Sequence, residues 1–358
     1  MQIVKLFLAI LLFMIITVSC SVNDSTNEEE IRYPEAVEQN IDPQGLTDAY
    51  DILTASPDTR CLLVERNGVL VQEEYLNGYT AERFYDLRSV TKSIISILIG
   101  IAIDQGSINS VDETIEDYLG DILPDLEPEK GALTIRHLIT MTTGLPWREL
   151  GYTSTDFSSW VTSDDQIMWI LDKPLFDTPG EYWNYNTGAS HILSAILTSA
   201  TGLSAKDFAQ QYLLTPLEGE VGDWSVDSRD NNFGGHGINF TAPDMIKIGR
   251  MMLNGGVYNG TQIVSAEWIE ESTQFLYSTN WAVPYGNGYG YLWWMGFDGA
   301  TGTTFFWAMG YGGQFLICIP EYNTVIAAAT RWSGVQDADN NWNWVLTTIV
   351  ENVFPALQ

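Results

Sequence analysis

Residues 94–103, the run IISILIGIAI, place the strongest constraint on how this chain folds. Only Ser96 and Gly100 interrupt the apolar side chains, so a helix over this run is apolar on every side. Such a helix must be enclosed by other elements, because a helix at the surface needs a polar face. The run therefore predicts a buried helix in a substantial core, which a chain of 358 residues is long enough to form.

Strand-like runs lie at both ends of the chain, with mainly helical patterns between Ser89 and about Gly255. Residues 59–78 predict a hairpin that turns at Asn67-Gly68, a dipeptide that favours a tight two-residue turn. The later runs predict three strands and a last helix, at 303–310, 313–320, 323–331 and 340–354. We therefore expect an α/β (α+β) fold with an antiparallel sheet built from both termini, flanked by helices, and an inserted, mainly helical lobe.

The first twenty residues, MQIVKLFLAILLFMIITVSC, have the pattern of an export signal. One lysine precedes an apolar run at 6–18, which is short for a membrane span and typical of a signal peptide. The run ends in TVSC, which resembles the lipobox of bacterial lipoproteins, whose cysteine is lipidated. We expect lipidation at Cys20 and an exported, membrane-anchored lipoprotein that faces the periplasm or the cell surface. A secretory peptide cleaved nearby and an uncleaved anchor are the alternatives.

The expected organisation has three parts. A lipoprotein-type signal peptide spans 1–20, a polar, acidic flexible tether spans 21–35, and a single domain spans 36–358. Its sheet lobe covers about 36–88 and 256–358, and its helical lobe about 89–255. A cleft between two lobes is a common place for a binding site.

Charge and metal-ligand content narrow the possible functions. The chain has 46 acidic residues against 16 lysines and arginines, a net charge of −30. A field of this sign repels phosphate backbones, so nucleic acid is not an expected partner. The three histidines have no close pairing with one another or with cysteine, so no metal site is predicted.

Ser89 and Lys92 lie directly before the apolar run, three residues apart. At this spacing a hydroxyl and an amine on one helix face can touch. Two interpretations stay open from these residues alone: Ser89 caps the helix while Lys92 reaches solvent, or Ser89 is a nucleophile beside its base. The second requires a neutral amine, and both the helix dipole and burial favour one by lowering the pKa of Lys92 below about 10.4.

Five ordered blocks of sequence, covering about residues 35–355, resemble the serine β-lactamase and penicillin-binding-protein superfamily. The resemblance is closest to its class C β-lactamase-related branch, which includes esterases, D-aminopeptidases and 6-aminohexanoate-dimer-hydrolase-like amidases. It implies a β-lactamase/transpeptidase-like fold. The blocks are FYDLRSVTKSIISILIGIAIDQG (84–106), LTIRHLITMTTGLP (133–146), PGEYWNYNTGASHILSAILTSATG (179–202), GGHGINFTAPDMIKIGRMML (234–253) and AMGYGGQFLICIPEYNTVIAAAT (308–330).

The first and third blocks carry the residues that the resemblance implies to be catalytic. Ser89 falls on the family nucleophile and Lys92 on its partner lysine. Tyr182 fits the literal Tyr-x-Asn pattern, but counting from Pro-Gly-Glu places the family tyrosine at Tyr185, which we choose. The third place of that motif, where a substrate is bound, then holds Thr187 instead of asparagine.

The last block carries the motif that is Lys-Thr-Gly or His-x-Gly in the family. Here it holds Tyr311, Gly312 and Gly313, which we expect to contact substrate along a strand edge. Family analogy assigns the oxyanion hole to the backbone N–H groups of Ser89 and Gln314. Tyr311 carries no charge where the family uses a cation to bind a carboxylate, which favours esters or amides over β-lactams.

The resemblance implies a serine hydrolase that forms an acyl-enzyme at Ser89 and hydrolyses an ester or amide of a small substrate, with no cofactor. Lys92 and Tyr185 would share the proton transfers, with the phenol pKa lowered by a close ammonium, and the base stays unassigned. The alternatives are a D,D-carboxypeptidase or muropeptide peptidase on cell-wall peptides, and a surface lipoprotein that binds without catalysis. The substrate, the oligomeric state and the role of His236 stay open.

The implied fold also bears on Cys61 and Cys318, which lie in strand-like runs that favour buried apolar side chains. In this fold the first strand pairs with the last, and the strand of Cys318 lies one position further away. Two strand spacings exceed the reach of a disulfide, so both thiols are expected to be free.

Overall fold

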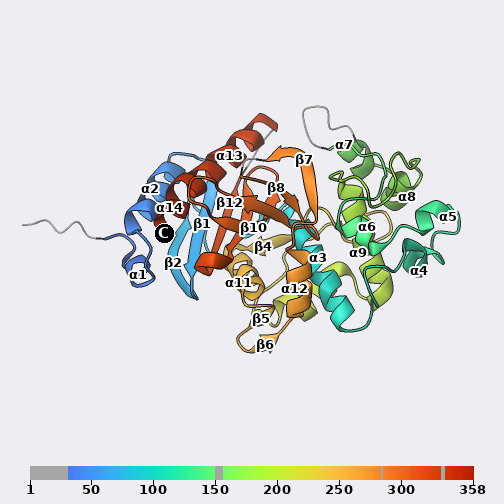
Figure 1. The fold of residues 1–358 in the computed structure, drawn as a ribbon, viewed down its shortest axis with the longest axis horizontal. Helices are drawn as coiled ribbons and strands as arrows, with labels where there is room; N and C mark the ends of the chain where they lie inside the picture. The colour runs from blue at the N-terminus through green and yellow to red at the C-terminus, as the bar shows by residue number, and fades with distance from the viewer. Residues whose placement is uncertain (1–30, 150–155, 284, 332–334) are drawn as a thin grey trace, which may run out of the picture. The chain divides into compact units, whose positions relative to one another are not determined.

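One sheet of eight strands, in the order β2-β1-β12-β11-β10-β9-β8-β7, organises the part of the chain that the structure describes (Figure 1). The computed structural model describes residues 31–149, 156–283, 285–331 and 335–358. Adjacent strands run antiparallel, and β1 (Thr59–Arg66) pairs with β12 (Thr324–Thr330), so strands from both ends of the chain form the sheet, as predicted. The other strands of the sheet are β2 (Val69–Tyr75), β7 (Tyr277–Val283), β8 (Gly286–Tyr289), β9 (Trp294–Phe297), β10 (Thr304–Gly310) and β11 (Gln314–Ile319).

The predicted hairpin is present, and Asn67 and Gly68 at its turn have φ angles of 53° and 91°. β12 separates β1, which carries Cys61, from β11, which carries Cys318. Both thiols are buried and free, so the prediction of two free cysteines is confirmed.

Strands β7, β8 and β9 extend the sheet beyond the strands predicted from sequence. Their short runs are rich in glycine and aromatic residues, which obscures the alternating pattern of a strand. Gly288 shows why glycine is used, because a Cβ there would lie 2.3 Å from the ring of Phe275. The last helix also begins earlier than predicted, at Val335.

Residues Arg32–Gln358 form one compact unit, and its described helices range from single turns to 15 residues in length. The four longest outside the C-terminal segment are α2 (Pro43–Thr54), α3 (Val90–Asp104), α9 (Thr187–Thr201) and α11 (Ala242–Leu253). The C-terminal segment is α13 (Val335–Thr348), η3 (Ile349–Val353) and α14 (Phe354–Ala356). The shorter helices are α1 (Pro34–Glu38), α4 (Ile115–Leu119), α5 (Pro128–Gly131), α6 (Ile135–Ile139), α7 (Asp156–Val161), α8 (Gln166–Leu171), α10 (Ala205–Ala209), η1 (Gln210–Leu214), α12 (Ala266–Ser272) and η2 (Pro320–Tyr322).

Helices cover both faces of the sheet. Phe315 on β11 packs against Trp342 of α13, with ring centroids 5.8 Å apart. The next residue, Leu316, points to the opposite face, where its side chain packs closely on Gly249 of α11. The sheet is therefore buried between α13 on one face and α11 on the other.

Helix α3 is buried from Val90 to Ala102, as the apolar run in its sequence predicts. The glycine that interrupts the apolar run has a packing role. A Cβ at Gly100 would lie 2.3 Å from the indole of Trp268, so its absence lets α12 approach α3. This helix carries the Ser89–Lys92 pair into the core.

Two small sheets complete the described strands. β3 (Phe84–Asp86), which leads to Ser89, pairs with β4 (Asn239–Thr241), and β5 (Val257–Tyr258) pairs with β6 (Thr261–Gln262). The pairing of β3 with β4 brings the residues around Ser89 beside the loop that precedes β4.

The predicted signal peptide, Cys20 and the tether as far as residue 30 lie outside the described residues. Helix α1 begins at Pro34, before the predicted end of the tether. Within the described ranges, no helix is both long and apolar enough to cross a bilayer.

Candidate active site

Ser89 lies at the start of α3, directly after a residue with a constrained backbone. Arg88 has a φ of 51°, and its backbone N–H donates to Asp86 Oδ1 at 3.0 Å. The Ser89 side chain makes no capping hydrogen bond to the helix. Instead Lys92 Nζ donates to Ser89 Oγ at 3.1 Å, so the structure contains the serine–lysine pair and not the capped helix with a solvent-exposed lysine.

Lys92 is buried, with 1% of its surface exposed. Its amine also donates to the carbonyl oxygen of Gly235 at 2.9 Å. Burial lowers the pKa of Lys92 to about 8, against a smaller opposing effect of the Glu149 carboxylate. The predicted direction of this shift is confirmed, and a pKa of about 8 leaves about a tenth of the amine neutral at pH 7.

Tyr185, and not Tyr182, lies beside the pair. The Tyr185 ring is buried, and its centroid is 4.7 Å from Lys92 Nζ. Tyr182 is 60% exposed. Asn184 donates to the carbonyl of Trp147 at 3.2 Å, so its side chain supports a neighbouring loop.

The pKa of Tyr185 differs from the expectation. Burial, followed by the Glu149 charge, raises the pKa of Tyr185 well above its ordinary value, although a hydrogen bond with Ser89 acts to lower it. The expectation that a close ammonium lowers this pKa is therefore wrong, because the sequence did not reveal how deeply the phenol is buried. Tyr185 is a neutral phenol that retains its proton.

Thr187 is fully buried at the start of α9. Its hydroxyl donates to Glu149 Oε1 at 2.7 Å, and its backbone N–H donates to Glu149 Oε2 at 3.2 Å. In this structure Thr187 is thus bonded within the wall of the site instead of facing open space. Sequence reasoning did not single out Glu149, since no known motif position marks it.

The segment from Tyr311 to Gln314 connects β10 to β11. Gly312 and Gly313 have φ angles of 86° and 99°, which glycine adopts readily, so they form a turn instead of the predicted strand edge. Tyr311 is 38% exposed, and the Gln314 side chain is buried, donating to the Thr330 carbonyl at 3.2 Å. Gln314 is therefore free to contribute only its backbone to a binding site.

Gly310, the last residue of β10, brings this turn close to Ser89. A Cβ at Gly310 would lie 2.3 Å from the carbonyl oxygen of Leu87 and 3.2 Å from the Cβ of Arg88. The turn therefore packs directly against the backbone that leads into Ser89.

His236 lies beside the Ser89–Lys92 pair. Its ring stacks on Phe233 with centroids 4.6 Å apart. Burial and then the nearby Lys92 lower the pKa of His236 to about 3, so the imidazole is neutral. Its Nε2 is buried without a hydrogen-bond partner among the described residues.

A second histidine anchors the same loop. His191 Nε2 lies 2.9 Å from Asp227 Oδ2, and both side chains are fully buried. The other ring nitrogen of His191 accepts from the backbone N–H of Gly234 at 3.3 Å. This pairing holds the loop whose Gly235 carbonyl binds Lys92, and the sequence offers no signal for it because the partners are 36 residues apart.

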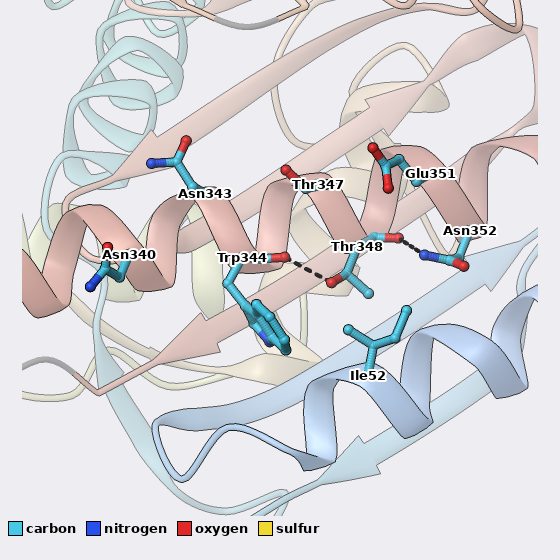
Figure 2. Close-up of a pocket in the computed structure, with 8 residues that line it drawn as sticks. All are labelled: Ile52, Asn340, Asn343, Trp344, Thr347, Thr348, Glu351 and Asn352. Atoms are coloured by element: carbon cyan, nitrogen blue, oxygen red, sulfur yellow. Dashed lines mark hydrogen bonds between the residues drawn. The ribbon is translucent and has the colours of Figure 1, made fainter.

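Two surface hollows lie away from this cluster. One, of about 500 Å³, lies between α2 and α13, and Figure 2 shows Trp344 and Ile52 on its apolar side with asparagines around them. The other, of about 530 Å³, lies over β8, β9 and β10. Neither is lined by Ser89, Lys92 or Tyr185, so the candidate site rests on the side-chain cluster and not on a hollow. Among the described residues, no three His, Cys, Asp or Glu side chains lie close enough together to hold a metal ion.

Comparison with known proteins gives consistent matches. A family model described as Beta-lactamase matches residues 44–348. The chain is 26% identical over 322 residues to a 6-aminohexanoate-dimer hydrolase of Paenarthrobacter ureafaciens, covering 84% of this chain and 79% of that protein.

Solved structures agree in fold. A candidate 6-aminohexanoate-dimer hydrolase from Bacillus anthracis superposes with a TM-score of 0.67 at 22% identity, covering 84% of this chain and 81% of that one. EstCE1, a hydrolase with promiscuous acyltransferase activity, superposes with a TM-score of 0.68 at 17% identity, covering 89% and 98%.

Proposed function

Because the chain belongs to the beta-lactamase family, we propose that it is a serine hydrolase that forms an acyl-enzyme at Ser89 and cleaves an ester or amide of a small substrate. One observation carries this proposal. The buried Lys92, whose pKa is about 8, lies 3.1 Å from Ser89 Oγ through its Nζ atom. A buried, partly neutral amine has little structural use, whereas it suits the activation of a hydroxyl.

The proton transfers follow from the two pKa values. Neutral Lys92 keeps an N–H on the Gly235 carbonyl and accepts the Ser89 proton with its lone pair. Ser89 Oγ then bonds to the substrate carbonyl carbon, and the backbone N–H groups of Ser89 and Gln314 stabilise the oxyanion. Tyr185, which retains its proton, donates it to the departing amine or alkoxide and recovers one from Lys92.

Deacylation reverses these roles. Water attacks the acyl carbon, its proton passes to the neutral Lys92, and the bond from the carbon to Ser89 Oγ breaks as Oγ regains a proton. The acid product leaves, and the residues return to their starting states without a cofactor.

The substrate that we propose lacks the carboxylate of a typical β-lactam. Tyr311 carries no positive charge, so it does not supply the ionic contact that the family's lysine or histidine makes. The 6-aminohexanoate-dimer hydrolase among its relatives is named for an amide, which supports an amide or ester as the bond cleaved here. That dimer itself ends in a carboxylate, so the name bears on the bond and not on the charge of the substrate. Cell-wall peptides ending in a carboxylate are correspondingly disfavoured.

The proposed function is tested by covalent labelling of the purified protein with a fluorophosphonate probe. We expect a single label on Ser89, lost in Ser89→Ala and retained in Ser159→Ala, which changes an exposed serine of α7. Turnover is then compared for a short-chain nitrophenyl ester, a chromogenic cephalosporin and a D-alanyl-D-alanine peptide, and we expect the ester to be the best substrate. A protein that neither takes the label nor hydrolyses the ester would leave a non-catalytic binding role.

We also propose that Cys20 carries a lipid anchor, from the apolar run and the TVSC motif. The full chain expressed in bacteria should partition into detergent and incorporate radiolabelled palmitate at Cys20, and Cys20→Ala should lose this label, whereas an uncleaved apolar anchor would give detergent partition without the label. Wild-type protein found entirely in the aqueous phase would contradict the anchor.

A further inference from the structure

Glu149 has a carboxylate that is held rigidly in the wall of the candidate site. Oε1 accepts from the Thr187 hydroxyl at 2.7 Å, and Oε2 accepts from the Thr187 backbone N–H at 3.2 Å and from Trp147 Nε1 at 2.8 Å. Three donors hold one carboxylate in place at the N-terminal end of α9. The helix dipole stabilises a negative charge at that end.

This carboxylate is connected to the reacting pair through Thr187. Thr187 follows Tyr185 by two residues, and the Tyr185 ring centroid is 4.7 Å from Lys92 Nζ. On its other side, Thr187 packs on Gly235, where a Cβ would lie 2.5 Å from Thr187 Cγ2. The Gly235 carbonyl accepts from Lys92, so Glu149, Thr187, Gly235 and Lys92 form one continuous chain of contacts.

Glu149 is a charged group near Lys92 that shifts the pKa values of several groups in the site. Its carboxylate acts to raise the pKa of Lys92, and it helps to raise those of Tyr185 and Tyr289. Tyr185 and Tyr289 are themselves neutral, with pKa values raised first by burial. The Glu149 charge thus acts on both members of the proton-transfer pair.

The other titratable and charged groups around Lys92 do not supply a second negative charge to it. His236 is neutral, with a pKa lowered to about 3 by burial and then by Lys92. Arg88 is cationic and pairs with Asp86, Nε to Oδ2 3.3 Å. The carboxylate of Asp227 is bonded to His191. The negative charge that these contacts direct at the Ser89–Lys92 pair is therefore that of Glu149.

We propose that Glu149 is a positioning residue that stabilises the ammonium form of Lys92 when Lys92 takes the Ser89 proton. In that step the proton moves from Ser89 Oγ to Lys92 Nζ, and a neutral pair becomes a nucleophilic oxygen and a cation. The fixed carboxylate favours the cation, and Thr187, in the motif place where the family has asparagine, holds the carboxylate in position. This inference rests on the proposed acyl-enzyme chemistry and adds to it the electrostatic effect of the Glu149 carboxylate.

The test is Glu149→Gln, which keeps a side-chain oxygen and removes the charge. The measurement is the pH dependence of the rate at which a fluorophosphonate labels Ser89, together with kcat/KM for a neutral nitrophenyl ester. Wild-type rates should rise through pH about 8 as Lys92 loses its proton. In Glu149→Gln this limb should move to lower pH by about one unit, because an opposite charge no longer favours the ammonium.

The plateau above the limb should fall about tenfold in Glu149→Gln, because a weaker base accepts the Ser89 proton less readily. Glu149→Asp, which keeps the charge, should leave the limb closer to its wild-type pH. Glu181→Gln removes an exposed carboxylate from the loop before Tyr185 and controls for the change in net charge. Its limb should match that of wild type.

Thr187→Val distinguishes the effect of the Glu149 charge from that of the Thr187–Glu149 hydrogen bond. It removes the hydroxyl that donates to Glu149 and keeps the carboxylate. If Glu149 acts only as a structural link, Glu149→Gln and Thr187→Val should lower activity alike with the limb unmoved, which would overturn the inference. An equal limb shift in Glu181→Gln would also overturn it. If wild type itself does not label at Ser89, it is the proposed function that fails.

Discussion

At the scale of residues, the properties of the candidate site follow from burying an amine. Lys92 is held in the core by contacts to Ser89 and Gly235, and its folded-state pKa of about 8 lies below the ordinary value of 10.5. The unfolded chain therefore binds more protons between these two pH values, and stability rises with pH across that window. Burial in the folded protein therefore disfavours the charged form of Lys92, which water solvates in the unfolded chain.

Lys92→Met should reveal how much stability the fold loses by burying the charged form of Lys92. The stability of the variant relative to wild type should be greatest near pH 7 and should decrease by about 3 kcal/mol as the pH rises to 10.5, from 1.36 kcal/mol for each pKa unit. Chemical unfolding at several pH values measures the difference, and other titrating groups cancel because both proteins contain them. A difference that does not change with pH would mean that Lys92 has an ordinary pKa. Labelling of Ser89 should be lost in this variant at every pH.

The two tyrosines of the third sequence block should respond differently to loss of the hydroxyl. Tyr185→Phe keeps the ring that packs against Trp183 and Trp294 but removes the proton donor. We expect kcat for an ester to fall about 100-fold, the range for loss of one general acid or base. Tyr182→Phe, at the exposed position, should leave kcat within about twofold, as surface substitutions do. The opposite pattern would reassign the motif to Tyr182.

At the scale of elements, the close approach of β10 to the start of α3 positions the site. Gly310 contacts the Leu87 carbonyl, while β3 and β4 fix the other side of the same segment. The Leu87 N–H donates to the Ile238 carbonyl at 3.0 Å. The segment that leads into Ser89 is therefore held between the end of β10 and the β3–β4 pair. The orientation of Ser89 does not depend on a capping hydrogen bond at the start of α3.

Gly310→Ala should disturb the packing of β10 against the segment that leads into Ser89. The added methyl would lie 2.3 Å from a backbone oxygen, so either β10 or the Leu87–Ser89 segment must move. Overpacking of this kind costs about 1–3 kcal/mol, and we expect a larger loss in kcat/KM than in stability because the shift occurs beside Ser89, the proposed nucleophile. Gly299→Ala, in an open loop where the nearest atom is 3.9 Å away, is the control and should be neutral. Wild-type activity in Gly310→Ala would show that the contact is dispensable.

The same elements show how far sequence carries the prediction. The apolar run of α3, the hairpin at Asn67-Gly68 and the long β10–β12 runs were predictable because their signals are local. Strands β7–β9 were not, since glycine and aromatic packing there depends on neighbours distant in sequence. The serine–lysine pair was accessible at a spacing of three residues, whereas Glu149 and the buried His191–Asp227 pair become visible only when separate segments meet. The raised pKa of Tyr185 likewise depends on burial that the sequence does not state.

At the scale of the whole molecule, the net charge of −30 should select among substrates by their charge. A field of this sign attracts cationic substrates and repels carboxylates. Raising the ionic strength from about 0.01 M to 0.15 M shortens the Debye length from about 30 Å to 8 Å. Across that range kcat/KM should fall for an ester that bears an ammonium, rise for one that bears a carboxylate and change little for a neutral ester. A common salt response of all three esters would show that the net field does not reach the site.

The pairing of β1 with β12 has a consequence for the growing polypeptide. Ser89 is synthesised early, but Gly310 and Gln314 on either side of the turn, and the strand that closes the sheet, appear more than 200 residues later. A chain emerging from the ribosome therefore contains Ser89, the proposed nucleophile, long before the surroundings of this residue exist. Contacts of such long sequence separation form late and slowly, and the α3 run stays without its partners until then. Assembly of the candidate site is thus delayed until synthesis has passed residue 330, and if the chain is exported as we propose, it crosses the membrane before the site exists.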